Sequence, residues 1–118
     1  MNIMTQYNNR TVSVIIPVYN AARFIGATLE SVLNQSYKDI EVVLVDDCSA
    51  DDSAKIIAEY SNRHPNIIYH RLKKNEGAAV ARNTALHLAG GRYVAFLDSD
   101  DLWCSDKIEK QLAFMDEK

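Results

Sequence analysis

Residues 11–18 read TVSVIIPV, a short run in which nearly every side chain is apolar and many are β-branched. Such a run is typical of a strand that is buried on both faces, as in a parallel sheet. Pro17 has no amide hydrogen to donate to a sheet, so we expect it to mark the end of this strand. Two similar runs follow, IEVVLV at 40–45 and YVAFL at 93–97, and a weaker one, IIYHRL, lies at 67–72.

Segments with helical periodicity separate these predicted strands. In residues 25–32, for example, Ile, Leu and Val recur at i, i+4 and i+7, which places them on one helical face. Asn20 stands where the N-cap of this first helix is expected, and Ser49 or Asp51 precedes the second helix in the same way. The sequence therefore alternates between strands and helices from residue 11 to its end.

This alternation predicts the fold class. Strands joined by helical crossovers are parallel, and the crossovers are right-handed. We therefore expect an α/β fold, with a three-layer α/β/α, Rossmann-like arrangement around a mostly parallel sheet. Residues 1–10 are polar and are expected to form a loose N-terminal tail, and residues 11–118 are expected to form a single domain.

Composition excludes several classes of protein. The 118 residues are 47% hydrophobic and 25% charged, which is ordinary for a globular domain and excludes a disordered chain or a coiled coil. The net charge of −3 argues against a nucleic-acid partner. Cys48 and Cys104 lie far apart and are expected to be free thiols. Without a signal peptide or an apolar run of ~18 residues, we expect a cytoplasmic protein, with any association with the inner face of the membrane made by other regions.

Polar side chains gather where the predicted strands end. The first strand ends in PVYN at 17–20, the second in Asp46 and Asp47, and the fourth in DSDD at 98–101. Because the carboxyl ends of parallel strands share one edge of a sheet, where ligands bind in such folds, we expect these residues to meet. Five carboxylates at one edge repel one another, so a cation is expected among them.

The acidic motif at the end of the fourth strand predicts a metal site. Mg²⁺ and Mn²⁺ prefer oxygen ligands, and Mg²⁺ typically takes one or two protein carboxylates and fills its shell with water and phosphate oxygens. Asp98 and Asp100 form an Asp-x-Asp pair that suits such an ion. From the residues alone, the sequence predicts a metal-assisted phosphate or nucleotide site.

Five blocks of the sequence resemble the family 2 glycosyltransferases, which have the GT-A fold. In this order and spacing they form a specific signature that extends over residues 11–118. The blocks are VSVIIPVYN at 12–20, SVLNQSY at 31–37, IEVVLVDDCS at 40–49, NEGAAVARN at 75–83 and GGRYVAFLDSDD at 90–101. The resemblance implies an inverting enzyme that uses Mg²⁺ or Mn²⁺ and transfers a sugar from a nucleotide diphosphate sugar, with a UDP-sugar favoured. It also implies a carbohydrate or lipid-linked acceptor and a role in surface polysaccharide biosynthesis.

The resemblance also implies roles for individual residues. Asp47 would accept the ring N–H of the base, Gly77 would let the backbone approach the nucleotide, and Arg82 would face the diphosphate. Asp98 and Asp100 would hold the metal ion. The full set expected to bind the nucleotide sugar is Pro17, Val18, Tyr19, Asp46, Asp47, Gly77, Arg82, Asp98 and Ser99.

One departure from the family concerns the catalytic base. Members of the family are more than twice as long, and their second half supplies the acceptor surface and the carboxylate that deprotonates the acceptor. We therefore expect the base to lie beyond Lys118. The 118 residues are expected to act as a nucleotide-sugar-binding portion that binds the donor and transfers sugar poorly or not at all. A sheet edge left uncovered here would favour a homodimer.

Three other functions fit parts of the pattern. A receiver-type signalling domain has a similar length and alternation, but it needs an acidic pair after its first strand, where this chain has PVY. A phosphatase with an aspartate nucleophile also uses Asp-x-Asp, but after its first strand. A non-catalytic nucleotide-sugar-binding module differs from the enzyme only in lacking the base, so these residues do not separate the two.

Overall fold

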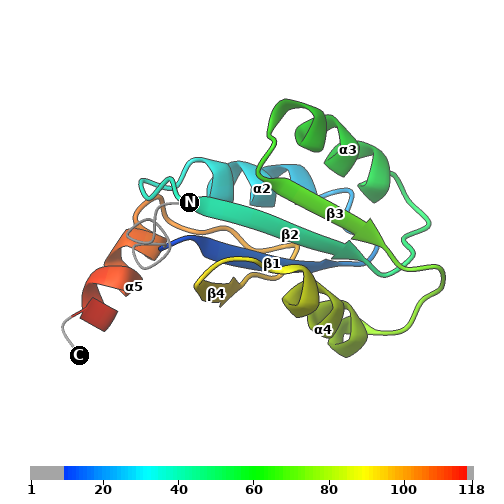
Figure 1. Ribbon diagram of the computed structural model, residues 1–118. Coiled ribbons are helices and arrows are strands. Elements are labelled where there is room, and N and C mark those ends of the chain that lie inside the picture. The colour runs from blue at the N-terminus through cyan, green and yellow to red at the C-terminus, as the bar shows by residue number, and fades with distance from the viewer. Residues whose placement is uncertain (1–9, 117–118) are drawn as a thin grey trace.

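The computed structural model describes residues 10–116, which form four strands and four helices in strict alternation (Figure 1). Of the predicted N-terminal tail, Arg10 alone lies within the described residues. Its carbonyl oxygen accepts a hydrogen bond from the Tyr37 hydroxyl at 2.7 Å. In chain order the elements are β1 (Val12–Val18), α2 (Ile25–Leu33), β2 (Ile40–Asp46), α3 (Ser53–Arg63), β3 (Ile67–Arg71), α4 (Ala78–Leu88), β4 (Tyr93–Phe96) and α5 (Lys107–Asp116).

The four strands form one sheet in the order β3-β2-β1-β4, and every pairing is parallel. Val12 is in register with Ile40 of β2 and with Tyr93 of β4, and Val42 is in register with Ile67 of β3. The predicted α/β class and parallel sheet are therefore confirmed. Because all strands run the same way, their carboxyl ends lie at one edge of the sheet.

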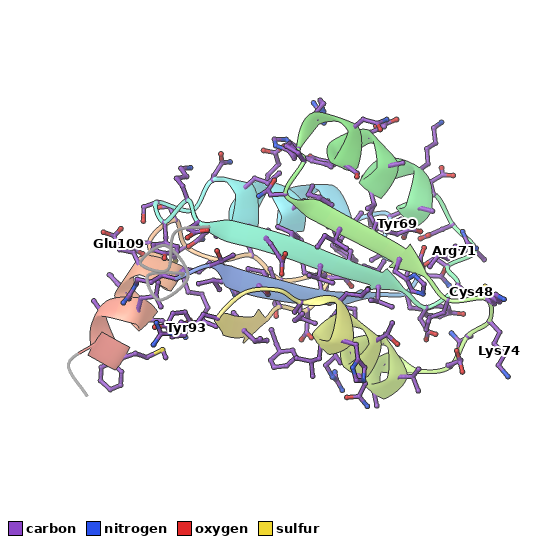
Figure 2. All side chains as sticks on the ribbon, viewed as in Figure 1. Cys48, Tyr69, Arg71, Lys74, Tyr93 and Glu109 are labelled. Atoms are coloured by element: carbon purple, nitrogen blue, oxygen red, sulfur yellow. The ribbon has the colours of Figure 1, made fainter. Side chains whose placement is uncertain are left out.

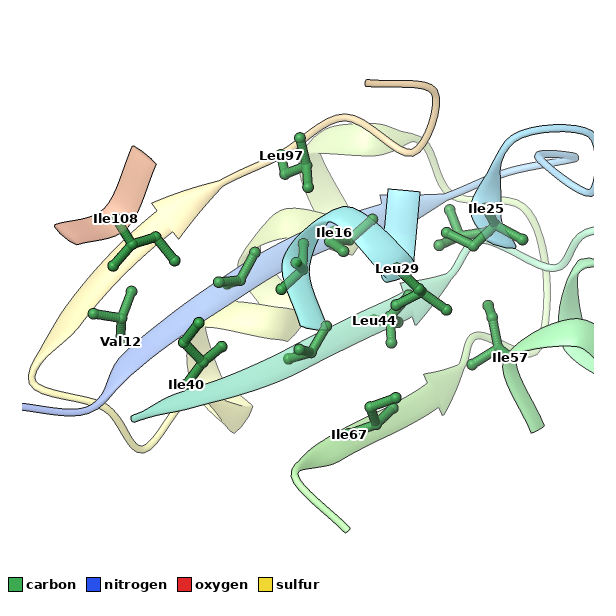
Figure 3. Close-up of a cluster of buried hydrophobic side chains, with 14 of the residues drawn as sticks. Val12, Ile16, Ile25, Leu29, Ile40, Leu44, Ile57, Ile67, Leu97 and Ile108 are labelled. Carbon is green, nitrogen blue, oxygen red and sulfur yellow. The ribbon is translucent and has the colours of Figure 1, made fainter. Parts of the chain in front are cut away.

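Helices cover both faces of the sheet, which gives the predicted three layers. On one face, α2, α3 and α5 pack through Leu29, Ile57 and Ile108 onto even-numbered residues of β1 and β2 (Figure 3). On the other face, α4 packs Ala81 and Ala85 against odd-numbered strand residues such as Val43. The small alanine side chains let α4 approach the sheet closely. Both central strands are thus buried on both sides, as their apolar runs predict.

The sequence did not predict that β4 is an edge strand. Val94 and Phe96 are 42% and 53% exposed, although YVAFL reads like the other buried runs. In Figure 1, α4 lies beneath the sheet, and its packing contacts are made with β1 and β2. The outward-facing side chains of β4 on this face therefore have no helix over them among the described residues.

The expected cap of the first helix is wrong. Asn20 does not cap α2, which begins at Ile25 after a turn. Asn20 instead has a positive φ of 48°, a conformation that Asn tolerates better than most residues. Of the two residues expected to cap α3, Asp51 accepts a hydrogen bond from the first helical amide, Ser53, at 3.0 Å. The other, Ser49, binds the backbone amide of Asn20.

Two further expectations concern cysteine and membrane-spanning segments. Cys48 and Cys104 are free thiols. Within residues 10–116, no helix has both the length and the apolar character that a membrane crossing requires.

Candidate functional site

A cleft of about 550 Å³ opens at the carboxyl edge of the sheet. It lies between the loop after β1, the end of β2, the first turns of α4 and the loop after β4. The predicted site residues that line it are Pro17, Val18, Tyr19, Asp47, Gly77, Arg82, Asp98, Ser99 and Asp100. Segments more than 80 residues apart in sequence thus meet in one cavity, and the predicted site residue that does not line it is Asp46.

The loop after β1 forms one wall and is fastened to the loop after β2. The Asn20 amide donates to Ser49 Oγ at 2.9 Å, and Asn20 Oδ1 accepts from the Ala50 amide at 2.8 Å. The Ala21 amide donates to Ser53 Oγ at 2.9 Å. These bonds satisfy backbone groups that no sheet or helix would reach, so the wall is preformed.

Asp51 strengthens the same connection between the two loops. Its Oδ2 accepts a hydrogen bond from the Ala22 amide at 3.1 Å, and its Oδ1 accepts from the Ser53 hydroxyl at 2.6 Å. Desolvation raises the pKa of the Asp51 carboxyl, but the hydrogen bonds from Ser53 and Ala22 outweigh it, so the pKa lies below its ordinary value. Asp51 does not line the cleft, and its part is structural.

Two aromatic rings stand at this wall with much of their surface open. Tyr19 is 52% exposed and Phe24 is 46% exposed, and both line the cleft. An aromatic face that is open to a cavity can stack on a planar ring of a ligand.

The side chain of Asp46 does not line the cleft. It is fully buried, its Oδ1 accepts from the Ser49 amide at 2.9 Å, and its Oδ2 accepts from the Tyr69 hydroxyl at 2.8 Å. Burial and this hydrogen bond to Asp46 raise the pKa of Tyr69 well above its ordinary value. Figure 2 shows Tyr69, Arg71 and Cys48 near the carboxyl end of β3. In the structure, then, Asp46 holds the loop that follows β2, and both of its oxygen atoms are engaged.

Asp47 points the opposite way, toward α4. Its carboxylate accepts hydrogen bonds from the backbone amides of Glu76 at 2.6 Å and Gly77 at 2.9 Å, and it is 4% exposed. Asn75 Nδ2 donates to the backbone carbonyl of Asp47 at 3.4 Å. One carboxylate thus fixes the turn that leads into α4, and its edge also forms part of the cleft wall.

Gly77 and Arg82 supply the α4 side of the cleft. Gly77 has a φ of 99°, which side chains rarely tolerate, and no atom lies within 4 Å of the position that a Cβ would take. The open space beside it belongs to the cleft. Arg82 is exposed one turn further along α4, and within residues 10–116 no carboxylate forms an ion pair with it. Its guanidinium is therefore available to an anionic ligand.

The acidic motif forms a tight turn at the cleft that Arg82 also lines. The Asp101 amide donates to the Asp98 carbonyl at 3.0 Å, and Asp98, Asp100 and Asp101 each place a carboxylate oxygen within 4.8 Å of the others. Two unit charges at that distance repel by about 1 kcal/mol even in water.

This donor set fits a hard divalent cation. All three side chains are exposed and can rotate, and their oxygen atoms are the ligands that Mg²⁺ and Mn²⁺ prefer. Asp101, which the Asp-x-Asp pattern left out, contributes an oxygen to the cluster but does not line the cleft.

Several residues of the site were not predicted from the sequence. Asn20, Phe24 and Asn75 line the cleft, and Asn75 and Phe24 carry groups that a ligand can use. Asn75 stands in the NEGAAVARN block, so its place in a loop before a helix could have singled it out. Phe24 gives no such signal, because an aromatic residue in an expected helix suggests core.

The comparison with known families now identifies the chain. The family described as Glycosyl transferase family 2 matches residues 13–118. The chain belongs to this family. Membership replaces the receiver and phosphatase interpretations, and it agrees with the five blocks quoted above.

Relatives in this family are longer than the chain. TuaG of Bacillus subtilis, which is named as a glycosyltransferase of teichuronic acid biosynthesis, is 54% identical over 107 residues, which are 91% of this chain and 42% of TuaG. The Escherichia coli UDP-Glc:alpha-D-GlcNAc-diphosphoundecaprenol beta-1,3-glucosyltransferase WfaP is 49% identical over 105 residues, 89% of this chain and 41% of WfaP. The chain thus spans about two fifths of the length of these relatives.

Solved structures share the architecture of the described domain. Staphylococcus aureus TarS 1–349 in complex with UDP superposes with a TM-score of 0.85 at 38% identity, over 91% of this chain and 32% of the TarS 1–349 chain. The mannosyltransferase PcManGT of Pyrobaculum calidifontis, in complex with GDP-Man and Mn²⁺, superposes with a TM-score of 0.83 at 32% identity, over 88% of this chain and 32% of PcManGT. TarS 1–349 has also been solved with UDP-GlcNAc. The described domain therefore corresponds to the N-terminal GT-A portion of larger homologues.

Proposed function

We propose that this chain is the donor-binding portion of an inverting glycosyltransferase that binds a UDP-sugar together with Mg²⁺ or Mn²⁺. The observation that carries the proposal is the convergence of Asp47, Arg82 and the Asp98–Asp100 turn on one cleft at the carboxyl edge of the sheet. Family membership and the UDP, UDP-GlcNAc, GDP-Man and Mn²⁺ in the related structures support it.

The nucleoside end of the donor is assigned to the β1 and β2 side of the cleft. Tyr19 and Phe24 are about half exposed and can stack on a planar base, Phe24 through the face that the Arg23 guanidinium does not cover. A carboxylate has about four lone-pair sites. Two sites of Asp47 are taken by backbone amides, so others are left to accept the ring N–H of a uracil. Asp46 acts indirectly, because its carboxylate holds the loop after β2, which begins with Asp47.

The diphosphate is assigned to the space between α4 and the acidic turn. Arg82 presents a cationic fork from one side, and Gly77 lets the backbone come near a phosphate without a Cβ in the way. Asp98 and Asp100 would hold the ion, with Asp101 beside them and Ser99 facing the ribose and diphosphate. When bound, a divalent ion neutralises charge that develops on the diphosphate leaving group. The role of these carboxylates is to hold the positive charge of the ion at one end of the cleft.

Direct displacement of the diphosphate also needs a base for the acceptor hydroxyl. The carboxylates that line the cleft are Asp47, Asp98 and Asp100, and each already has a part in holding donor or metal. Asp106, which directly precedes α5, pairs with Lys110 at 3.1 Å, and Glu109 on α5 accepts a hydrogen bond from Ser36. We therefore propose that these 118 residues bind the donor but transfer sugar poorly or not at all.

We also propose a biological setting, which is based on the names of the relatives. TuaG is named for teichuronic acid biosynthesis, and the name of WfaP gives a lipid-linked acceptor, GlcNAc-diphosphoundecaprenol. We place this chain in surface polysaccharide synthesis at the cytoplasmic side of the membrane, with a carbohydrate or lipid-linked acceptor. The uncovered β4 edge is offered as the contact of a homodimer.

Calorimetry with UDP and GDP, each with and without Mn²⁺, tests the proposal. We expect UDP to bind more tightly with Mn²⁺ than without it, and GDP to bind more weakly than UDP. No nucleoside diphosphate binding under any of the four conditions would refute the proposed function. Turnover of a UDP-sugar onto an acceptor by this chain would refute the assignment as a binding portion alone. A full-length protein that binds UDP-sugars but transfers none would establish the non-catalytic module instead.

A further inference from the structure

A row of polar side chains on α2 and just beyond its end runs along the segment that carries the acidic motif. Thr28 and Ser31 lie on α2, and Gln35 lies two residues after its last residue, Leu33; their spacing of i, i+3 and i+7 places them along one side. Thr28 and Gln35 are fully buried, although both are polar. Thr28 lies on α2 beside Leu29 and Val32, which are fully buried in the core. Buried polar groups at such positions need hydrogen-bond partners.

Each member of this row binds the backbone of the segment from residue 99 to 108. Thr28 Oγ1 donates to the Ser99 carbonyl at 2.8 Å, across 71 residues of sequence. Ser31 Oγ accepts from the Trp103 amide at 3.3 Å. Gln35 Nε2 donates to the Cys104 carbonyl at 2.6 Å, and its Oε1 accepts from the Ile108 amide at 3.1 Å. The segment is therefore fastened along α2 from the acidic turn to α5.

The contact of Thr28 differs from the other two because it reaches into the acidic turn itself. The Ser99 carbonyl belongs to the peptide that joins Ser99 to Asp100, so fixing it restricts ψ of Ser99 and φ of Asp100. These angles determine the direction in which the Asp100 side chain leaves the backbone. The Asp101 amide to Asp98 carbonyl bond, at 3.0 Å, closes the turn around this peptide, but such a bond is compatible with either orientation of the central peptide, so the Thr28 contact selects the orientation.

We propose that Thr28 is a positioning residue for the metal-binding turn and acts through the backbone of Ser99. The inference rests on the proposed function, because it assigns the carboxylates of Asp98 and Asp100 to a divalent ion. Those carboxylates are exposed and repel one another, and the bond from the Asp101 amide to the Asp98 carbonyl closes the turn without setting the orientation of its central peptide. Thr28 contributes the anchor from a helix whose apolar face, including Ile25 and Leu29, is wholly buried in the core.

The test is the substitution Thr28→Val, which keeps the shape of the side chain and removes the hydroxyl. Thr28→Ser retains the hydroxyl and is the conservative variant. Thr84→Val is the matched control, because the Thr84 hydroxyl bonds the carbonyl of Val80 within α4 and lies away from the acidic turn. For each folded protein, Mn²⁺ affinity in the presence of UDP is measured by electron paramagnetic resonance, and UDP affinity without metal by calorimetry.

We expect Thr28→Val to weaken Mn²⁺ binding about fivefold, because the net free energy of one ordinary hydrogen bond corresponds to a change in affinity of about this size. Metal-free UDP affinity should stay within about twofold of the wild type, and Thr28→Ser and Thr84→Val should match the wild type in both measurements. If Thr28→Val does not fold, Thr28→Ala removes the same hydroxyl with less bulk and is measured in its place.

Two results would overturn the inference. Mn²⁺ affinity unchanged in the variant without the hydroxyl would show that the turn needs no anchor. An equal loss of UDP affinity with and without Mn²⁺ would show that Thr28 supports the fold in general. A wild-type protein that binds UDP without any Mn²⁺ dependence would instead refute the metal assignment in the proposed function, and the inference would fall with it.

Discussion

Replacing Asp47 with Ala should damage stability and donor binding together. The carboxylate accepts hydrogen bonds from the amides of Glu76 and Gly77 at 2.6 and 2.9 Å and is 4% exposed. A hydrogen bond to a charged group contributes about 1.5–3 kcal/mol. Glu76 is exposed and Gly77 is half-buried, so water can replace part of each bond in the variant. We therefore expect the free energy of unfolding to fall by about 2–4 kcal/mol, a large share of the total for a domain of this size.

Urea denaturation followed by circular dichroism measures the first effect, and calorimetry with UDP measures the second. Loss of the contact to the base should weaken UDP binding by about 1–3 kcal/mol in the fraction that is folded. Asp52→Ala is the control, because Asp52 is exposed and its side chain makes no capping bond to α3. It should change the free energy of unfolding by less than about 0.5 kcal/mol.

Two results would refute this reasoning about Asp47. If the Ala variant were as stable as the wild type, the two short hydrogen bonds would contribute nothing to holding the turn before α4. If the variant lost stability but bound UDP and GDP with the affinities of the wild type, Asp47 would hold the turn without contacting the base.

Three further substitutions test other parts of the account. Gly91→Ala would place a Cβ 2.6 Å from two oxygen atoms near the start of β1, so we expect the free energy of unfolding, measured by urea denaturation, to fall by about 1–3 kcal/mol. Gly90→Ala is the control, because the nearest atoms to its Cβ would lie at 3.7 Å, and it should be tolerated. Tyr69→Phe removes the hydrogen bond to the buried Asp46 carboxylate and should lower the free energy of unfolding by about 1.5–3 kcal/mol in the same assay; an unchanged midpoint would contradict the role given to that pair. Phe96→Glu places a charge on the exposed β4 edge and should abolish dimerisation in analytical ultracentrifugation; a monomeric wild type would contradict the proposed dimer.

Local sequence patterns predicted the two central strands, β1 and β2, well because these strands are buried on both faces. Nearly every side chain of β1 and β2 is apolar, and this marks a central parallel strand whatever its neighbours are. The order of strands in the sheet is a matter of topology, however, and YVAFL carries no sign that β4 lies at an edge. Contacts between distant segments were equally invisible, as with Thr28 and Ser99, because neither residue is unusual in its own segment.

The predicted residues at the ends of the strands line one cleft except for Asp46, and that exception has a simple cause. Successive side chains of a strand point to opposite faces. Leu44 and Asp46 therefore face α2 and α3, whereas Val45 and Asp47 face α4. Counting this alternation along β2 would have separated the two aspartates without any structure. The positive φ of Asn20 has no comparable signal, because Asn serves equally well as a helix cap and in a left-handed turn.

The central claim is that the acidic turn after β4 holds a divalent ion for a nucleoside diphosphate, and Asp100→Asn tests it most directly. Calorimetry with UDP, with and without Mn²⁺, should show that the variant loses the part of the affinity that depends on Mn²⁺. Its fold should be as stable as the wild type or slightly more stable, because one repulsive charge in the turn is gone. If Asp100→Asn bound UDP with the full Mn²⁺ dependence of the wild type, the assignment of this turn as the metal site would be wrong.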